Sequence, residues 1–145
     1  MNENVELLEF INEASDMGKH SVMSTLNLIK DKDNKIKKSI EDVLKGYEKF
    51  YKESKVLLNK MGEKGTKSPL MAKIGSMMGI KKEVDKDNSD AAIAGMIMQG
   101  LTMGVVETSV KIENYETIAD KKIIILARDF LKFQEDSVEK LKKFL

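Results

Sequence analysis

Few side chains in this sequence of 145 residues are suited to catalysis or metal binding. The chain has no cysteine, which excludes thiolate nucleophiles, zinc-thiolate sites and disulfides. Its one histidine, His20, has the chemistry of a general base or a metal ligand. The helical spacing around His20 places it opposite the apolar stripe formed by neighbours such as Ile11 and Val22. We therefore expect His20 to face solvent, and we expect no catalytic residue and no cofactor.

Two further polar residues fall close to predicted helix interiors. Glu107 is the acid nearest to an inner face, which makes it a weak candidate for a metal ligand. A boundary residue paired with a lysine or a tyrosine hydroxyl is the interpretation we prefer. Gln134 lies on an apolar stripe, where we expect a hydrogen-bonded core amide. Other acids, including Asp16, are expected to point outwards, because burying an unpaired carboxylate is costly.

The charge balance argues against a nucleic-acid partner. The chain has 25 basic and 24 acidic residues, whereas a phosphate-binding surface needs a clustered basic excess. There is no Trp, and the five Phe and three Tyr are too few to suggest base-stacking platforms. The first ten residues lack the basic and apolar regions of a signal peptide, so we expect a cytoplasmic protein.

Apolar residues at helical spacing predict an all-α fold in a single domain over residues 1–145. Four long helices are expected near residues 3–30, 35–61, 89–115 and 119–145. Short links within each pair predict antiparallel pairs, while a long crossover at about residues 62–88 predicts that the second and third helices are parallel. Ser68 and Pro69 are typical of the start of a short helix in this crossover, which Gly79 would end.

Residues 91–106 form the most apolar stretch and carry no charge. We expect them to lie in a central helix that is buried on nearly all sides. The stretch is shorter than the roughly 17–25 residues that span a bilayer, so we do not expect membrane association.

The third predicted helix carries a second apolar face that a simple four-helix bundle would leave bare. The expected cover is either the crossover helix or a second copy of the chain, which predicts a homodimer. We expect Gly100 to lie at the closest approach, so that Gly100→Leu would cost about 1–3 kcal/mol. The predicted interaction face comprises Met96, Gly100, Met103 and Val110 on the third helix and Met71, Ile74, Met77 and Met78 in the crossover.

Several segments of the chain resemble ferritin-like four-helix bundles, in particular small bacterial members found largely in Firmicutes. The segments are residues 16–18, 69–74, 98–104, 131–135 and 141–145. This resemblance implies a four-helix bundle with one long crossover. A ferritin-like dimetal site uses a Glu from two helices and a Glu-x-x-His from the other two, and this sequence contains no Glu-x-x-His.

The functional expectation is a non-catalytic structural or binding protein that self-associates. Two alternatives remain open. One is an iron- or manganese-binding protein or oxidoreductase with a displaced carboxylate site. The other is a carrier of an apolar ligand, which would need a cavity lined by Met77, Met78, Met96 and Met103.

Overall fold

The structure, a computed structural model, describes residues 2–65 and 70–145. Its helices are α1 (Glu3–Ile29), α2 (Lys37–Lys60), α3 (Leu70–Lys86), α4 (Asp90–Tyr115) and α5 (Lys121–Leu141), followed by the short 3-10 helix η1 (Lys142–Phe144). The described ranges contain no strand, so the all-α prediction is confirmed. The four long predicted helices correspond to α1, α2, α4 and α5, with ends that differ by a few residues.

Local chemistry explains where several helices begin and end. The side chain of Asn2 accepts hydrogen bonds from the backbone N–H groups of Asn4 and Val5, and Ser89 caps α4 in the same way at Ala92. After α2, Gly62 adopts a φ of 77°, a left-handed conformation that favours glycine and stops the helix. The predicted helix start at Ser68 and Pro69 lies outside the described residues.

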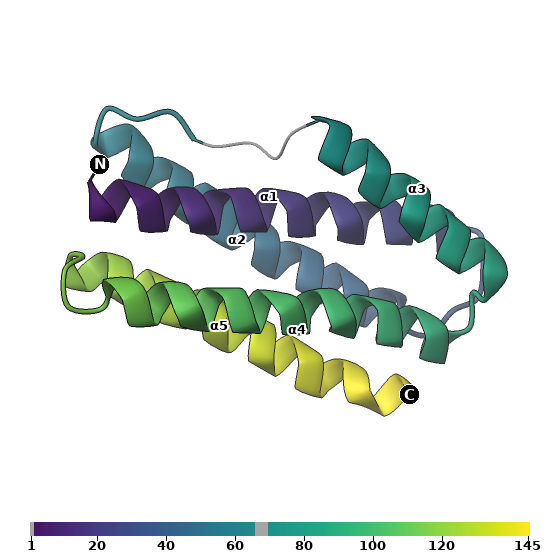
Figure 1. Ribbon diagram of the computed structural model, residues 1–145. Helices are drawn as coiled ribbons and strands as arrows, with labels where there is room; N and C mark the ends of the chain where they lie inside the picture. Colours follow the sequence, from purple (N-terminus) through teal and green to yellow (C-terminus); the bar gives the residue numbers. More distant parts are fainter. Residues whose placement is uncertain (1, 66–69) are drawn as a thin grey trace.

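The long helices form two antiparallel hairpins, α1 with α2 and α4 with α5 (Figure 1). The crossover returns the chain along the molecule through α3, so that α2 and α4 run in the same direction (Figure 1). This is the arrangement predicted from the one long connection. The C-terminal part of α3 leads directly into α4, while α3 packs mainly against α1.

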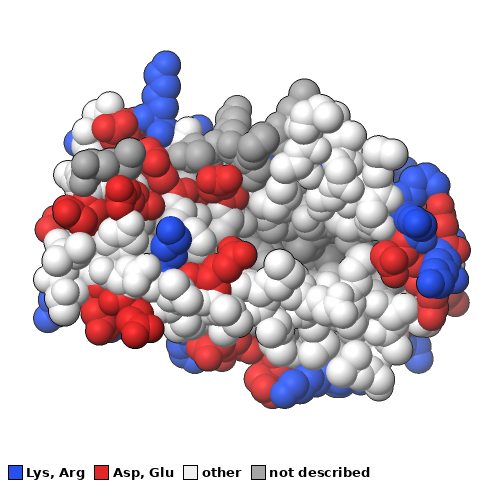
Figure 2. Space-filling view, viewed as in Figure 1, with Lys and Arg blue, Asp and Glu red and all other residues white. Residues whose placement is uncertain are grey.

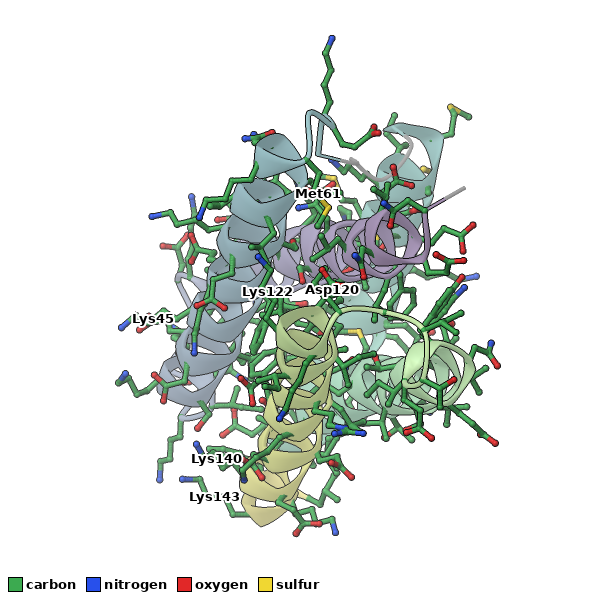
Figure 3. The ribbon with its side chains drawn as sticks, turned by 90° about the vertical axis from the view of Figure 1, so that its left-hand side faces the viewer. Lys45, Met61, Asp120, Lys122, Lys140 and Lys143 are labelled. Carbon is green, nitrogen blue, oxygen red and sulfur yellow. The ribbon has the colours of Figure 1, made fainter. Side chains whose placement is uncertain are left out.

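The core lies between the two hairpins and includes a cluster of aromatic rings from α2 and α5. The ring of Tyr47 meets that of Phe133 edge-on, with centroids 5.1 Å apart, and Phe50 packs against Phe130 at 5.2 Å. Viewed along the bundle, Lys45, Lys140 and Lys143 project away from the helices (Figure 3). Charged side chains therefore lie on the outside of the bundle and apolar side chains lie in its interior, as the helical spacing of apolar residues in the sequence predicts.

Two expectations about the middle of the chain are wrong. Helix α4 is not buried on nearly all sides, because only 28% of its most apolar 18-residue window is buried. Within the described ranges α4 is the one helix that is long and apolar enough to span a membrane, a test that core helices of soluble proteins also pass. The crossover helix is longer than expected, since α3 continues past Gly79 to Lys86.

Candidate functional site

An apolar groove opens between α1, α3 and α4 on the face shown in Figure 2, where uncharged residues surround a hollow. Its volume is about 810 Å³, within the range of roughly 300–1,000 Å³ that is typical of small-molecule sites. Tyr47 of α2 and Gln134 of α5 reach the groove from the far side of the bundle. The hydrophobic lining is Phe10, Ala14, Met17, Val22, Ala72, Ile80, Met96, Ile97, Leu101 and Met103.

Two glycines form part of the groove where α1 and α4 approach large side chains. A Cβ atom at Gly18 would overlap the ring of Tyr47, and one at Gly104 would overlap the amide oxygen of Gln134. Each glycine therefore lets a large side chain from the other helix of its own hairpin extend into the space between the helices. Both glycines follow a groove-lining methionine, Met17 or Met103.

Gln134 is almost fully buried, with 1% of its surface exposed. Its amide nitrogen donates to the hydroxyl of Thr108 at 3.0 Å and to the backbone carbonyl of Phe130 at 3.3 Å. The prediction that Gln134 is a hydrogen-bonded core amide is therefore confirmed for its nitrogen atom. The carbonyl of Phe130 can only accept, which fixes the nitrogen on that side and directs the amide oxygen towards Gly104.

The charged residues that line the groove are acidic. Glu13 and Glu107 border it, and its described lining contains no Lys, Arg or His. Glu107, the weak candidate for a metal ligand, is exposed at the edge of the groove and does not point into the core. Among the described residues, no three His, Cys, Asp or Glu side chains lie together in a way that could hold a metal ion.

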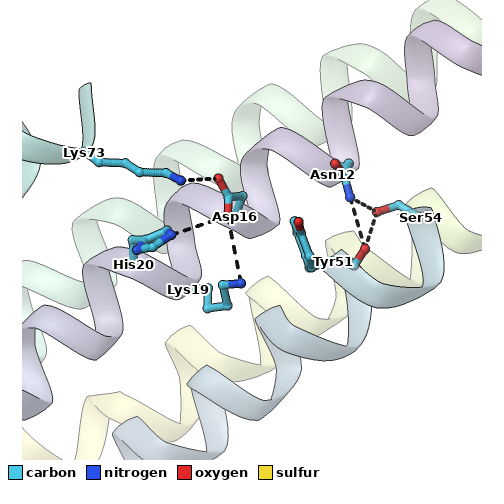
Figure 4. A network of polar contacts seen from close by, with 7 residues as sticks. All are labelled: Asn12, Asp16, Lys19, His20, Tyr51, Ser54 and Lys73. Carbon is cyan, nitrogen blue, oxygen red and sulfur yellow. Dashed lines mark hydrogen bonds and ion pairs between the residues drawn. The ribbon is translucent and has the colours of Figure 1, made fainter. Parts of the chain in front are cut away.

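A polar network attaches α3 to α1 beside the groove (Figure 4). Nζ of Lys73 lies 2.9 Å from Oδ2 of Asp16, whose side chain is only 3% exposed. One turn further along α3, the hydroxyls of Ser76 and Ser21 are 3.1 Å apart. These contacts hold α3 as one side of the groove, with Ile80 packed partly against the core.

Two expectations about α1 are corrected by this network. Asp16 is buried rather than outward-facing, because α3 covers that side of α1. His20 is half-buried rather than solvent-facing, with Nε2 at 3.5 Å from Oδ1 of Asp16. Burial lowers the pKa of His20, and the positive charge of Lys73 lowers it further, although Asp16 acts in the opposite direction. Nζ of Lys19 also lies 3.9 Å from Asp16.

On its other side, α1 makes a buried contact with α2. The side-chain nitrogen of Asn12 donates to the hydroxyl of Ser54 at 3.0 Å and to the backbone carbonyl of Tyr51 at 3.1 Å (Figure 4). The sequence stripes did not single out Asn12, which is fully buried. These bonds fix α1 between α2 and α3 and so position the groove residues that α1 carries.

Of the eight residues of the predicted interaction face, three line the groove and the other five are exposed outside it. Met96, Gly100 and Met103 line it from α4, whereas Val110 is exposed further along that helix. In α3 the four predicted residues are exposed and do not cover α4. The expected cavity lining is therefore correct for Met96 and Met103 and wrong for Met77 and Met78.

Gly100 does not lie at a close approach between helices. A Cβ atom at this position would have nothing within 4 Å among the described residues. No described residue is close enough for a leucine at position 100 to overpack against, so the predicted cost of Gly100→Leu is not supported. The close approaches occur at Gly18 and Gly104, and at Gly46, where a Cβ atom would overlap the ring of Phe133.

Neither a protein family model, nor a curated protein, nor a solved structure matches this chain. Sequence periodicity placed Met96, Gly100 and Met103 on an interaction face, and the groove they line also takes in residues of α1, α2, α3 and α5. The signal that points to the groove is the set of small residues on facing helices, Ala14 and Gly18 on α1 with Gly100 and Gly104 on α4, which leave space between the backbones.

Proposed function

We propose that this protein is a non-catalytic binding protein that takes up a small apolar molecule in the groove between α1, α3 and α4. The groove itself carries this proposal, because its volume and its largely hydrophobic lining match those of small-molecule sites. Three methionines, Met17, Met96 and Met103, line it. Their flexible, polarisable side chains adapt to ligands of different shape.

We also propose that the scaffold is a ferritin-like bundle that lacks the dimetal ligands. Two antiparallel hairpins, a parallel α2 and α4, and one long crossover support this assignment (Figure 1). In such a scaffold the space between facing helices is where a cofactor or ligand is held. The groove lies in that space, with glycine and methionine in place of metal-binding side chains.

Binding can be tested with diphenylhexatriene, a hydrocarbon whose fluorescence rises when it leaves water. Gly100→Phe places a ring in the groove without a clash at Cβ. We expect it to weaken probe binding by about tenfold or more, because the ring occupies space that the probe needs. Circular dichroism would verify that the variant keeps its helices.

Gly95→Phe provides the matched control. Gly95 lies on the same helix and is equally open at Cβ, but it is not part of the groove. Both changes replace a helical glycine with phenylalanine, so their effects on helix propensity are the same. A wild-type protein that does not bind the probe, or equal effects of the two variants, would refute the proposed function.

Self-association is a second candidate function, supported by exposed hydrophobic side chains on α3 and α4. Met71 and Met78 of α3 are 78% and 69% exposed, and Met103 of α4 is 65% exposed. Val106 and Val110 extend this surface along α4. Grouped apolar side chains of this kind mark interaction surfaces in soluble proteins. A homodimer formed through this face would cover the groove mouth.

A further inference from the structure

Two buried polar side chains in the groove have atoms without a hydrogen-bond partner. The first is the amide oxygen of Gln134. Both of its amide hydrogens are used by Thr108 and Phe130, while Oε1 accepts no hydrogen bond from the described residues. The absence of a side chain at Gly104 leaves room for this oxygen beside the α4 backbone.

The second is the hydroxyl of Tyr47. Only 7% of this residue is exposed, and its ring packs against Phe130 and Phe133. Within the described parts of the chain, Oη makes no hydrogen bond, although buried tyrosine hydroxyls usually find a partner. Burial raises the pKa of Tyr47, so the hydroxyl keeps its proton and remains a donor at neutral pH.

Both atoms remain accessible from the groove. Among the described residues, the fully enclosed side-chain atoms without a partner are Oδ1 of Asn12 and Oγ of Ser15. Oη of Tyr47 and Oε1 of Gln134 also lack partners but are not enclosed, and both residues line the groove. An apolar ligand without a polar group would remove water from both atoms and leave them unsatisfied, at a cost in affinity.

The charges around the groove restrict the ligand further. Glu13 and Glu107 border it, and no cationic side chain lies in its described lining. A carboxylate or phosphate on the ligand would therefore be repelled and would lose its hydration without compensation. The groove consequently disfavours fatty acids and other anionic amphiphiles.

We propose that the ligand of this groove is an uncharged apolar molecule with a hydroxyl group, which donates to Oε1 of Gln134 and accepts from Oη of Tyr47. A hydroxyl fits because it can donate and accept at once. Long-chain alcohols have this chemistry. The proposal rests on the proposed binding function and specifies the class of molecule that is bound.

Three amphiphiles with the same chain and different head groups test this proposal. Dodecan-1-ol, dodecanoate and dodecyltrimethylammonium are each tested in competition with diphenylhexatriene at about pH 8. The alcohol is kept below its solubility limit and the two charged amphiphiles below their critical micelle concentrations. We expect dodecan-1-ol to bind about tenfold more tightly than dodecanoate, whose carboxylate Glu13 and Glu107 repel. Dodecyltrimethylammonium, which those acids attract but which makes no hydrogen bond, should also bind more weakly than the alcohol. Equal competition by all three would overturn the inference while leaving the binding function intact.

Tyr47→Phe and Gln134→Met then test the two atoms separately. Tyr47→Phe removes a hydroxyl that has no partner in the described structure, so folding should be preserved. We expect each variant to weaken dodecan-1-ol binding by about three- to tenfold relative to the binding of diphenylhexatriene, which has no polar atom and therefore loses no hydrogen bond when either group is removed.

Met17→Leu is the control, because it changes a groove-lining side chain without changing any hydrogen-bonding group. The ratio of its affinity for dodecan-1-ol to its affinity for diphenylhexatriene should equal the wild-type ratio. Unchanged alcohol binding in Tyr47→Phe and Gln134→Met would refute the roles of these residues. A wild-type protein that binds none of the probes would refute the binding function itself.

Discussion

At the scale of single residues, the glycines in the helices have different roles. Gly46 lies directly beside the ring of Phe133, whereas Gly100 has open space around it. The sequence alone gives both residues the same helix-weakening effect. Only the packing of the neighbouring helix distinguishes a glycine that allows a close contact from one that borders a groove.

A pair of alanine substitutions separates these roles. Each replacement should gain roughly 1 kcal/mol of helix propensity. Gly46→Ala must also displace the ring of Phe133, so we expect its stability to fall about 1–3 kcal/mol below that of Gly100→Ala. Urea denaturation followed by circular dichroism measures the difference. Equal stabilities would mean that Phe133 moves aside without cost.

At the scale of the helices, the position of α3 explains most of the differences between expectation and structure. Helix α3 packs against α1, not over the second apolar face of α4. Side chains on two sides of α1 are therefore covered, and a residue such as Asp16 becomes buried although it lies off the main stripe. Helix α4 correspondingly keeps an exposed side.

The ion pair between Lys73 and Asp16 helps to attach α3 to α1, so replacing Lys73 should have a measurable effect on stability. We expect Lys73→Met to lower the free energy of unfolding by about 2 kcal/mol, because Asp16 is buried and loses a charged partner. Limited proteolysis should also cut within α3 sooner than in the wild type.

Lys81→Met on the same helix is the matched control. Lys81 pairs with Asp85, but both side chains are more than half exposed. Such surface pairs contribute about 1 kcal/mol or less, so this variant should resemble the wild type. Similar stability losses in Lys73→Met and Lys81→Met would show that the pair with Asp16 is unimportant.

The sequence predicted the helices well because each one has a clear apolar period and turn residues at its ends. The ends of α1 and α4 are within one residue of their expected positions. The groove was anticipated only as an alternative, with Met96 and Met103 in its lining, since periodicity shows which side chains face inwards but not how far apart the helices lie. The polar network around Asp16 also depends on Lys73, a residue 57 positions away in sequence, which no local pattern identifies.

At the scale of the whole molecule, an uncharged surface surrounds much of the hollow in Figure 2, while the rest of the same view carries many Asp, Glu, Lys and Arg residues. The proposed homodimer would bury this face. We expect Val106→Lys to shift the protein towards monomers in light scattering, because a lysine in an apolar interface loses its hydration. Val56→Lys on α2 makes the same replacement at a similarly exposed position and should leave the mass unchanged. A monomeric wild type would exclude the dimer.

The methionines of the groove have a consequence for how the protein responds to oxidants. The chain contains ten methionines and no cysteine, so its thioethers are the sulfur atoms that peroxide can reach. Oxidation turns an apolar methionine into a polar sulfoxide, and methionine sulfoxide reductases reverse the change. Met103, exposed at the groove, would react ahead of the half-buried Met17 and Met96. Oxidation would then make the groove more polar and weaken the proposed binding of an apolar molecule, and reduction would restore it.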